Sequence, residues 1–515
     1  MRRWKTLLVW MVLGSIFLGS FIPGGKVVAS AVEESEPALA DSEKKVSTLS
    51  PITAKVILID PGHCGAHPGA YGNGLKEHVV VLDISLACRN ALAQYGDVTV
   101  YMTREDNTCC RSLELGDCLT ARSNYAKLLD GDFLVSMHLN AGWGSGANVL
   151  TAYKSGYHDE IRVKTQKFGR IALKKLKELG IANRGLLLRK SENRTRYKDG
   201  SLADYYSIVR NGVNNRIPGV IIEHGYVSSY YDCSNFFNTT AKRKKLGKAD
   251  AEALVSYYNL SKKTIKGSFE KIDGDIYYVT STGKKVTGWV KKDESWYYLD
   301  ESTGKLQTGF LDYQGETVYL APSTGKMVVG WFCVDDENYL AKGNGALVKN
   351  QIYSNAINYY LFDENGKQLK KGMHTVDGAT YYVNKKGYLV SGVVKVDGKY
   401  YGFDQETKQQ LYGYQKVKGK CYYFDALTGA AVIKRILTIE GKKYYFGDKG
   451  VRATGWVQYK GAKYYFKKNG VMVTGWKKID GYYYYFDKST GKMQKNKWIG
   501  KYYVNSDGRR TKKKK

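Results

Sequence analysis

Cysteine is scarce in this chain, with eight among 515 residues. So few thiols cannot staple a chain of this length, which excludes a small disulfide-rich scaffold. Six of the eight lie between Cys64 and Cys233, and the sequence does not indicate how any of them pair. The adjacent Cys109 and Cys110 would form a strained ring if joined, so we expect them to be free or separately paired.

Long apolar segments are missing after residue 31, so no later segment is expected to span a membrane. Residues 1–31 are typical of a secretory signal peptide: basic residues precede an apolar run over 7–21, and small residues (Ala29, Ser30, Ala31) follow it. Two glycines and Pro23 interrupt the apolar region, which favours cleavage over retention as a membrane anchor. We therefore expect a secreted protein.

Acidic residues are outnumbered, because 49 Asp and Glu face 80 Lys and Arg and leave a net charge of +31. A basic chain rich in aromatic residues can bind nucleic acid, but export argues against that partner. Clustered lysines raise the affinity for any polyanion. Anionic polymers of a cell wall, such as teichoic acids, or a lipid surface fit an exported protein better.

The chain changes in composition twice. Residues 32–50 are polar, of mixed charge and without periodicity, as in a linker. Residues 51–262 alternate strand-like and helical patterns, which predicts an α/β domain with a mostly parallel twisted sheet flanked by helices. The expected strands are residues 55–60, 98–103, 133–138, 148–153 and 220–223, and the expected helices are residues 77–94, 113–129, 159–179 and 248–260.

Residues 263–515 repeat a short aromatic pattern. An aromatic pair such as Tyr277-Tyr278 or Tyr464-Tyr465 recurs about every 20 residues, interleaved with pairs such as Gly288-Trp289. Each unit fits a β-hairpin of two short strands. One hairpin cannot bury its own rings, so we expect about twelve of them to stack into an all-β solenoid.

Three apolar strands of the α/β domain each lead to a residue able to do chemistry. The first ends at Asp60-Pro61-Gly62 before His63, the second leads to His138, and the third leads to Glu223. If the strands are parallel, their carboxyl ends share one edge of the sheet, where open α/β sheets place their sites. A glycine-rich loop after His63 delivers Glu77 to the start of the next helix.

Two imidazoles and one carboxylate suit a catalytic zinc ion that keeps one position open for water. The ion would acidify that water toward neutrality. The remaining carboxylate could then act as general base and as proton donor to a leaving amine. Glu223 is well placed for this role, although Glu77 could exchange roles with it as far as the sequence indicates.

The motifs around these residues resemble those of zinc-dependent N-acetylmuramoyl-L-alanine amidases of the amidase-3 family. The resemblance covers residues 56–260 and rests, in order, on Asp60-Pro61-Gly62-His63, Glu77, Thr103-Arg104, Leu119-x-x-Arg122, residues 136–140 (SMHLN) and residues 222–226 (IEHGY). It implies that His63, Glu77 and His138 bind one Zn²⁺ and that Glu223 is catalytic. It also implies hydrolysis of the amide between N-acetylmuramic acid and L-alanine of the peptidoglycan stem peptide.

The chain departs from that family pattern in two places. Cys64 stands where glycine is usual, and His224-Gly225-Tyr226 replaces a small residue followed by Gly-Phe. We expect Cys64 to be an inert small residue rather than a redox-sensitive thiol or an extra metal contact. We expect His224, on the opposite face of its strand from Glu223, to support the metal ligands at most, without binding the metal. The remaining histidines are expected at surface or structural positions: His67, His78, His158 and His374. Two arginines, Arg104 and Arg122, are expected to orient a loop, to bind an anionic substrate or to form structural ion pairs.

The repeats resemble the choline-binding and glucan-binding repeats of bacterial wall hydrolases, glucan-synthesising enzymes and clostridial toxins. The choline-binding kind holds a quaternary ammonium between aromatic rings through cation–π attraction. The candidate ligand-binding residues are Trp289, Trp296 and Trp331, with Trp456, Trp476 and Tyr484 as a second group. Most other tyrosines are expected to pack between hairpins, and the choice between choline and a carbohydrate ligand stays open.

These features predict a secreted, wall-associated peptidoglycan hydrolase of the autolysin type, held on its insoluble substrate by the repeats. A zinc peptidase cutting within stem peptides would use the same metal chemistry. A catalytically inactive adhesin would need only the repeats, but the four intact site residues argue against it. A toxin-like protein that binds membranes or host glycans is suggested by the repeats alone.

Overall fold

The computed structural model describes residues 45–46, 49–109, 117–262, 264–355 and 357–513. It divides into a unit Met1–Glu43 and a unit Lys44–Lys515. The first unit, with the predicted signal peptide and most of the predicted linker, lies outside the described residues. None of the helices in the described ranges is long and apolar enough to cross a membrane.

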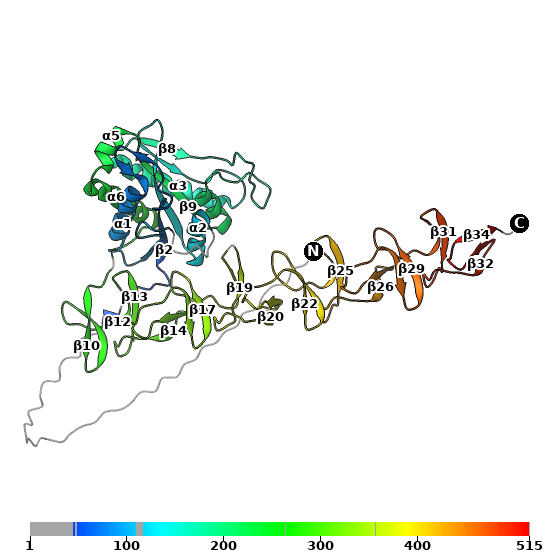
Figure 1. The fold of residues 1–515 in the computed structure, drawn as a ribbon. Coiled ribbons are helices and arrows are strands. Elements are labelled where there is room, and N and C mark those ends of the chain that lie inside the picture. Colours follow the sequence, from blue (N-terminus) through cyan, green and yellow to red (C-terminus); the bar gives the residue numbers. More distant parts are fainter. Residues whose placement is uncertain (1–44, 47–48, 110–116, 263, 356, 514–515) are drawn as a thin grey trace, which may run out of the picture. The chain divides into compact units, whose positions relative to one another are not determined.

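A six-stranded sheet forms the centre of the α/β domain, in the order β5-β2-β6-β9-β7-β8 (Figure 1). Strands β5, β2, β6 and β9 are parallel, whereas β7 runs antiparallel to β9 and β8 runs parallel to β7. The prediction of a mostly parallel sheet is confirmed. The strand bounds are β2 (Lys55–Pro61), β5 (Val98–Met102), β6 (Phe133–Asn140), β7 (Ala147–Leu150), β8 (Asn183–Leu187) and β9 (Gly219–Tyr226).

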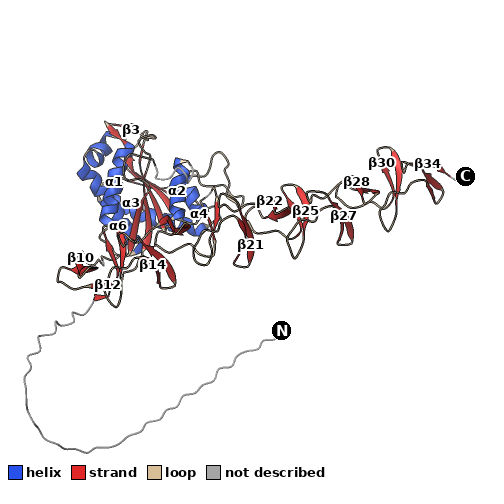
Figure 2. Cartoon of the chain, turned by 60° about the horizontal axis from the view of Figure 1, so that its bottom comes forward, coloured by secondary structure: helices blue, strands red, loops and turns tan. Residues whose placement is uncertain are grey.

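Helices cover both faces of this sheet (Figure 2). On one face lie α1 (Glu77–Leu92), α3 (Asp159–Glu178) and α6 (Thr240–Tyr258), and on the other lie α2 (Cys118–Leu128) and α4 (Ser207–Asn215). Side chains of β2 alternate between the two cores: Ile57 and Ile59 join the first, and Val56 and Leu58 join the second. An uninterrupted apolar strand is therefore buried on both faces, as its sequence indicates.

The structure differs from the expected elements where local signals are weak. Helix α6 begins at Thr240 instead of residue 248, because the Thr239 hydroxyl caps it by accepting from the amide of Lys242. Strand β8 and helix α4 were not expected, and residues 113–116 of the expected helix 113–129 lie outside the described residues. Small elements complete the domain: β3 (Tyr71–Gly72), β4 (Leu75–Lys76), α5 (Tyr230–Asp232) and the π-helical turn η2 (Cys233–Phe237).

Hairpins of a repeating type follow the α/β domain. Between residues 267 and 504, within the described ranges, the 24 strands β10 to β33 pair consecutively into twelve antiparallel hairpins, and β34 (Arg510–Lys513) adds to the last. The prediction of stacked hairpin repeats is confirmed. Their strands are β10 (Gly267–Ile272), β11 (Asp275–Thr280), β12 (Val286–Lys292), β13 (Ser295–Leu299), β14 (Gly309–Tyr313), β15 (Glu316–Leu320), β16 (Gly330–Val334), β17 (Glu337–Ala341), β18 (Ile352–Ser354), β19 (Tyr359–Leu361), β20 (Gly372–Val376), β21 (Ala379–Val383), β22 (Gly392–Val396), β23 (Lys399–Phe403), β24 (Gly413–Val417), β25 (Lys420–Phe424), β26 (Arg435–Ile439), β27 (Lys442–Phe446), β28 (Gly455–Tyr459), β29 (Ala462–Phe466), β30 (Gly475–Ile479), β31 (Tyr482–Phe486), β32 (Lys497–Ile499) and β33 (Tyr502–Val504).

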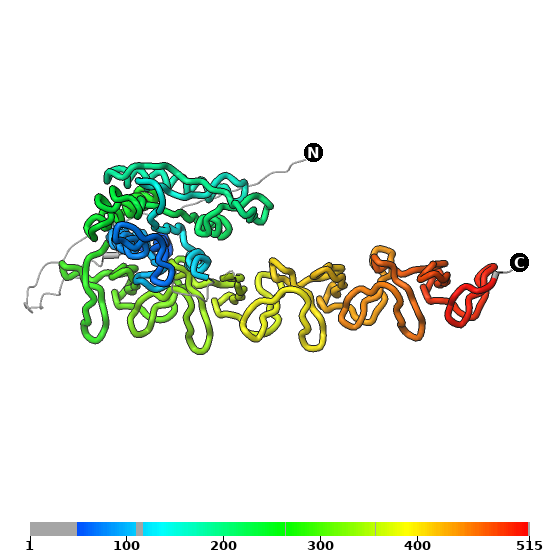
Figure 3. Tube along the Cα trace, turned by 45° about the horizontal axis from the view of Figure 1, so that its top comes forward, coloured from blue at the N-terminus to red at the C-terminus, as the bar shows by residue number. Residues whose placement is uncertain are grey.

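Two local features explain the repeat. Most hairpins turn through two residues with positive φ, such as Asp273-Gly274 and Lys460-Gly461, as type I′ turns require. The segment after each hairpin then bonds back to an earlier one: the amide of Met327, for example, donates to the carbonyl of Trp296 at 2.9 Å. The successive hairpins can be followed along the trace in Figure 3.

The first repeats also share a core with residues near the start of the α/β domain. Trp289 and Trp296 are 0% and 1% exposed and pack with Leu49 and Ala54. The indole nitrogen of Trp296 donates to the hydroxyl of Thr99 on β5 at 2.9 Å. Lys45–Val46 (β1), at the end of the predicted linker, pairs in parallel with β12.

Candidate metal centre and catalytic site

Four predicted site residues meet at the carboxyl ends of three parallel strands. His63 lies two residues beyond β2, His138 is on β6, and Glu223 is its neighbour on β9 in register. Glu77 is the first residue of α1 and reaches this edge from the side. Parallel pairing of β2, β6 and β9 therefore assembles residues that are up to 160 positions apart in the chain.

Glu77 lies between the two imidazoles. Its Oε1 is 3.2 Å from His63 Nε2 and 3.1 Å from His138 Nδ1, and it accepts from the amide of Leu139 at 3.0 Å. Its other oxygen accepts from the amide of Ala70 at 2.8 Å. The side chain is 3% exposed, so these contacts fix it firmly in place.

Two glycines leave the space that the imidazoles occupy. A Cβ at Gly62 would lie 2.4 Å from the His138 ring, and a Cβ at Gly69 would lie 2.5 Å from a carboxylate oxygen of Glu77 and 2.6 Å from the His63 ring. Gly69 also has a φ of +72°, which disfavours other residues. The glycine-rich loop thus wraps closely around the two rings and the carboxylate.

A buried ion pair holds the turn that carries His63. Asp60 is fully buried and accepts from Thr103 at 2.5 Å, from Ser136 at 2.6 Å and from the guanidinium of Arg122. Arg122 also donates to the carbonyl of His63 at 2.7 Å. Arg122 therefore forms a structural ion pair and also orients the loop of His63, two of the roles considered for it.

Arg104 has a similar structural position. It is fully buried and donates to the carbonyls of Pro61, Gly62 and His78 at 3.0, 2.8 and 2.8 Å. All of its partners named here are backbone oxygens of the segment that forms the site. Arg104 thus ties the His63 turn to the start of α1.

Glu223 carries an unusual polar atom. Its Oε2 is buried and has no hydrogen-bond partner among the described residues. Burial raises the pKa of Glu223 to about 7, against the opposing charge of His138. A buried carboxyl oxygen without a partner, beside a cluster of metal-ligand residues, is suited to hold and release a proton.

The electrostatics of the cluster favour a charged Glu77. Burial alone would raise the pKa of Glu77, but hydrogen bonds and charge from His138 and His63 hold it far below its usual range. Burial would likewise lower the pKa of His138, yet the hydrogen bond and charge of Glu77 and the charge of Glu223 raise it. The site thus stabilises negative charge on Glu77 and positive charge beside it, which a metal cation can supply.

The residues fit a zinc ion. The ligand atoms of His63, Glu77 and His138 all lie within 4.8 Å of one another. Ligands of a tetrahedral zinc ion are separated by about 3.4 Å for nitrogen and oxygen donors, close to the 3.2 and 3.1 Å observed around Glu77. Three protein ligands leave one position open, and the unpartnered oxygen of Glu223 lies on the strand beside His138.

The other histidines take varied positions. His224 is fully buried, bonds Asp250 at 2.9 Å and reaches the carbonyl of His138 at 3.2 Å, so it touches a predicted ligand only through its backbone. Burial alone would lower the pKa of His224, but the charge and the hydrogen bond of Asp250 raise it. His78 is buried and contacts the carbonyl of Pro68, a structural role. His158 contacts Glu160, and His374 contacts the carbonyl of Lys370.

A second donor cluster was missed in the sequence. Cys64, His67, Cys109 and Cys118 bring their ligand atoms within 4.8 Å of one another. Cys64 was expected to be inert, and His67 a surface or structural residue. The spacing Cys64-x-x-His67 was the available signal, but its partners come from segments that sequence spacing does not connect. Cys110, considered together with Cys109, lies outside the described residues.

The candidate ligand residues of the repeats separate into buried and open groups. Trp289 and Trp296 are buried, with no face open to a ligand. Trp331 is 38% exposed, and its ring centroid is 4.9 Å from that of Tyr360. Trp456 is 40% exposed, and its ring lies at 77° to the ring of Tyr484 with 4.9 Å between centroids.

A pocket surrounds Trp456 and Tyr484, lined also by Lys463, Asp507 and Arg509. Trp476 belongs to the next hairpin pair, against Tyr485 and Tyr502 rather than Tyr484. The guanidinium of Arg510 lies 5.9 Å from the Trp476 ring and 4.6 Å from the Tyr502 ring. The cation position at Trp476 is therefore taken by the chain itself.

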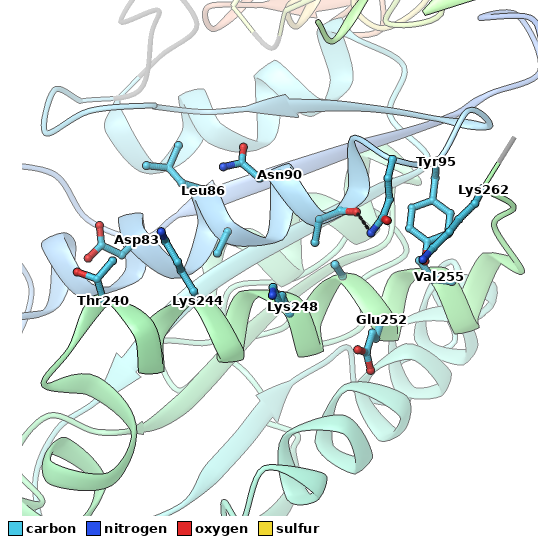
Figure 4. A pocket seen from close by; sticks show the side chains of 14 residues that line it. Asp83, Leu86, Asn90, Tyr95, Thr240, Lys244, Lys248, Glu252, Val255 and Lys262 are labelled. Carbon is cyan, nitrogen blue, oxygen red and sulfur yellow. Dashed lines mark hydrogen bonds between the residues drawn. The ribbon is translucent and has the colours of Figure 1, made fainter. Parts of the chain in front are cut away.

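Another groove lies between α1 and α6, lined by Asp83, Asn90, Tyr95, Lys244, Lys248 and Glu252 among others (Figure 4). None of the four predicted site residues lines it. The four predicted site residues thus lie at the strand ends and not in this groove.

Comparison with known proteins agrees with the motifs. Residues 57–256 match the family model for N-acetylmuramoyl-L-alanine amidase, and residues 265–310 and 453–498 match the model for the choline-binding repeat. The sporulation-specific N-acetylmuramoyl-L-alanine amidase of Bacillus subtilis is 27% identical over 224 residues, which covers 42% of this chain and 72% of that protein. The probable cell wall amidase LytH of Staphylococcus aureus is 30% identical over 224 residues, covering 43% and 63%.

Solved structures match parts of the chain at low identity. CbpJ from Streptococcus pneumoniae is 23% identical with a TM-score of 0.37, covering 48% of this chain and all of that one. An N-acetylmuramoyl-L-alanine amidase from Clostridium difficile is 20% identical with a TM-score of 0.33, covering 40% and 98%. The resemblance to amidases and to choline-binding-type repeats is confirmed by the family models and the curated relatives.

Proposed function

We propose that the chain is a secreted, zinc-dependent peptidoglycan hydrolase, because residues 57–256 match the family model for N-acetylmuramoyl-L-alanine amidase. It cleaves the amide between N-acetylmuramic acid and L-alanine of the stem peptide, and its repeats hold it on the cell wall. The proposal is carried by one observation: the unpartnered buried oxygen of Glu223 lies beside the cluster of His63, Glu77 and His138.

His63, Glu77 and His138 would hold the zinc ion. When bound, zinc supplies a Lewis acid that polarises a carbonyl oxygen and lowers the pKa of water. Glu77 neutralises part of the charge and is itself fixed by the amides of Ala70 and Leu139. The ion pair of Asp60 with Arg122 keeps His63 in place through its carbonyl.

Glu223 would move the proton. Its buried Oε2 takes a proton from the attacking water and then delivers it to the nitrogen of the departing L-alanine. A pKa of about 7 means that the carboxyl group both accepts and releases a proton near neutral pH. The sequence allowed Glu77 to exchange roles with Glu223, and the geometry favours the original assignment, because Glu77 has both oxygens engaged and Glu223 does not.

The test uses purified peptidoglycan and the full chain. Wild-type protein should release new N-terminal L-alanine without new reducing sugar ends, and a chelator should abolish the release until zinc is restored. Glu223→Gln should lower kcat by at least about a hundredfold, because general acid–base catalysis contributes that much. Glu160→Gln, which removes an exposed carboxylate at the start of α3, is the matched control and should retain activity.

Other outcomes would replace the proposal. New amino ends on other stem residues would identify a zinc peptidase. Wall binding without any cleavage, from protein shown to contain zinc, would identify an inactive adhesin.

The repeats would hold the enzyme on its substrate by raising its local concentration there. The pocket at Trp456 and Tyr484 is the site we propose for a quaternary ammonium such as choline on teichoic acids, because two aromatic rings, packed edge to face, and the carboxylate of Asp507 line it. Trp456→Ala should reduce binding to choline-bearing walls and leave binding to choline-free walls unchanged. Tyr412→Ala, an exposed tyrosine outside this pocket, is the control. An equal loss of binding on both kinds of wall would instead indicate a glycan or anionic ligand.

A further inference from the structure

A second cluster of metal donors lies next to the site but shares none of its predicted ligands. Cys64 and His67 are on the turn after β2, Cys109 is on the loop after β5, and Cys118 is the first residue of α2. Their four ligand atoms lie within 4.8 Å of one another. Three thiols and one imidazole are a common donor set of structural zinc sites.

The measured separations fit a four-coordinate ion. His67 Nδ1 lies 3.4 Å from Cys64 Sγ and 3.8 Å from Cys109 Sγ. Around a tetrahedral zinc ion, a sulfur and a nitrogen ligand are about 3.6 Å apart and two sulfur ligands about 3.8 Å apart. A disulfide would bring two sulfurs to about 2.05 Å and would leave the imidazole and the third thiol without a partner. All seven cysteines in the described ranges are free thiols here.

The backbone positions the donors without help from an ion. Cys64 and His67 exchange backbone hydrogen bonds at 3.0 and 3.1 Å, which closes the turn that carries both side chains. The amide of Gly65 donates to the carbonyl of Asn107 at 2.7 Å and joins this turn to the loop of Cys109. A Cβ at Gly65 would lie 2.9 Å from that carbonyl oxygen, so the two loops approach as closely as a glycine permits.

A positively charged side chain lies beside the cluster of thiols. Three thiolates around a divalent cation leave one net negative charge. Arg122 Nη2 lies 3.7 Å from Cys118 Sγ and provides a compensating charge and a hydrogen bond. Cys118 also occupies the first turn of α2, at the positive end of the helix dipole.

We propose that Cys64, His67, Cys109 and Cys118 bind a second metal ion of the zinc class, separate from the catalytic one. All four positions of this ion are filled by the protein, so it is structural and not catalytic. It joins the turn after β2, the loop after β5 and the start of α2. The catalytic ligand His63 immediately precedes Cys64, so the ion steadies the segment that carries it.

Metal content of the full chain gives the first measurement. Wild-type protein, purified in zinc and without chelator, should contain two zinc ions per chain. Cys109→Ser and Cys118→Ser should contain one, whereas Cys333→Ser, which removes an exposed thiol in the repeats, should keep two. His138→Ala should lose the catalytic ion alone and also retain one.

Cobalt substitution distinguishes the two sites by the ligands that each provides. A thiolate bound to Co²⁺ gives a strong charge-transfer absorption in the near ultraviolet, which a site of two imidazoles and a carboxylate cannot give. We expect this absorption in wild type, His138→Ala and Cys333→Ser, and its loss in Cys109→Ser. Loss of peptidoglycan cleavage in His138→Ala with the absorption retained would separate this proposal from the proposed function.

Three results would overturn the proposal. The first is wild-type protein that binds cobalt without the thiolate absorption. The second is a zinc content that the cysteine substitutions do not change. The third is a disulfide among Cys64, Cys109 and Cys118, found by thiol counting and peptide mass mapping of the zinc-loaded chain.

Discussion

Replacing Asp60 tests whether the site depends on a buried ion pair. Asp60→Asn keeps the shape of the side chain but removes the charge that faces Arg122, and both groups are almost completely buried. The substitution leaves an uncompensated guanidinium inside the domain. Breaking a buried pair in this way costs about 3–5 kcal/mol.

Hydrogen exchange measures this loss of stability in peptides of the α/β domain. A chain that combines an α/β domain with a long repeat array does not unfold in one two-state step, so one melting temperature does not describe it. Peptides covering Lys55–Pro61 and Phe133–Asn140 report on the strands that flank the pair. A loss of 3–5 kcal/mol would lower their protection roughly 10²- to 10³·⁷-fold, since each tenfold change corresponds to about 1.4 kcal/mol.

Two companion variants show whether the charge is the cause. Arg122→Met in the Asp60→Asn background removes the stranded charge and should recover part of the protection, because apolar replacements of buried pairs are often tolerated. Asp159→Asn removes a partly exposed pair with Arg162 and should cost no more than about 1 kcal/mol. A loss below tenfold for Asp60→Asn, or no recovery in the double variant, would refute the reasoning.

The pH dependence has a definite sign. Burial alone would raise the pKa of Asp60, but the charge of Arg122 and the hydroxyls of Ser136 and Thr103 hold it below its usual 3.8. The folded domain therefore binds this proton less readily than the unfolded chain does. The contribution of Asp60 is complete above pH 3.8 and is lost as the pH falls below that value, so wild type and Asp60→Asn should converge in acid.

Three further substitutions test separate parts of the α/β domain. Gly62→Ala would place a Cβ 2.4 Å from the His138 ring. It should weaken zinc binding roughly ten- to a hundredfold, measured by competition with a coloured chelator. An unchanged zinc affinity would contradict the close fit. Gly247→Ala would place a Cβ 2.2 Å from the carbonyl of Ile84 and should destabilise the packing of α1 against α6 by about 1–3 kcal/mol, measured by exchange of peptides from both helices; unaltered exchange would count against it. Trp143, on the loop between β6 and β7, is fully exposed, so Trp143→Ala should change stability by less than about 0.5 kcal/mol. If the ring stacks on substrate, the same variant should raise KM for peptidoglycan about fivefold. An unaltered KM excludes that role.

The sheet edge could be predicted from the sequence because its signals are local. Apolar, β-branched runs mark β2, β6 and β9, and each ends at a residue whose chemistry is recognisable by itself. The strand predicted at residues 148–153 corresponds to β7, but its antiparallel direction was not predicted. The short β8 could not be predicted, because Asn183, Arg184 and Gly185 give it no strand-like pattern. Its place in the sheet comes from pairing with β7, a contact between distant segments.

In the repeats, the arrangement of the hairpins could be predicted, but the role of each aromatic ring could not. The period and the hairpins follow from aromatic pairs and turn residues, but the pattern does not say which rings face a ligand. Trp289 carries the same Gly-Trp motif as Trp456, yet it is buried. Trp296 is buried too, and it bonds Thr99, 197 residues away. A ring that closes a core and a ring that lines a pocket have the same local sequence, so only the tertiary contacts separate them.

Arg122 connects the two donor clusters, because it contacts residues of both. Its guanidinium pairs with Asp60, donates to the carbonyl of His63 and approaches the thiol of Cys118. A rigid, five-donor group is suited to such a position, because a lysine could not satisfy three partners in one plane. The second ion would fix Cys118 and thereby one contact of Arg122, and Arg122 in turn fixes the backbone of a catalytic ligand. With that ion bound, Cys64 would help to support the turn that carries His63, a proposed ligand of the catalytic zinc.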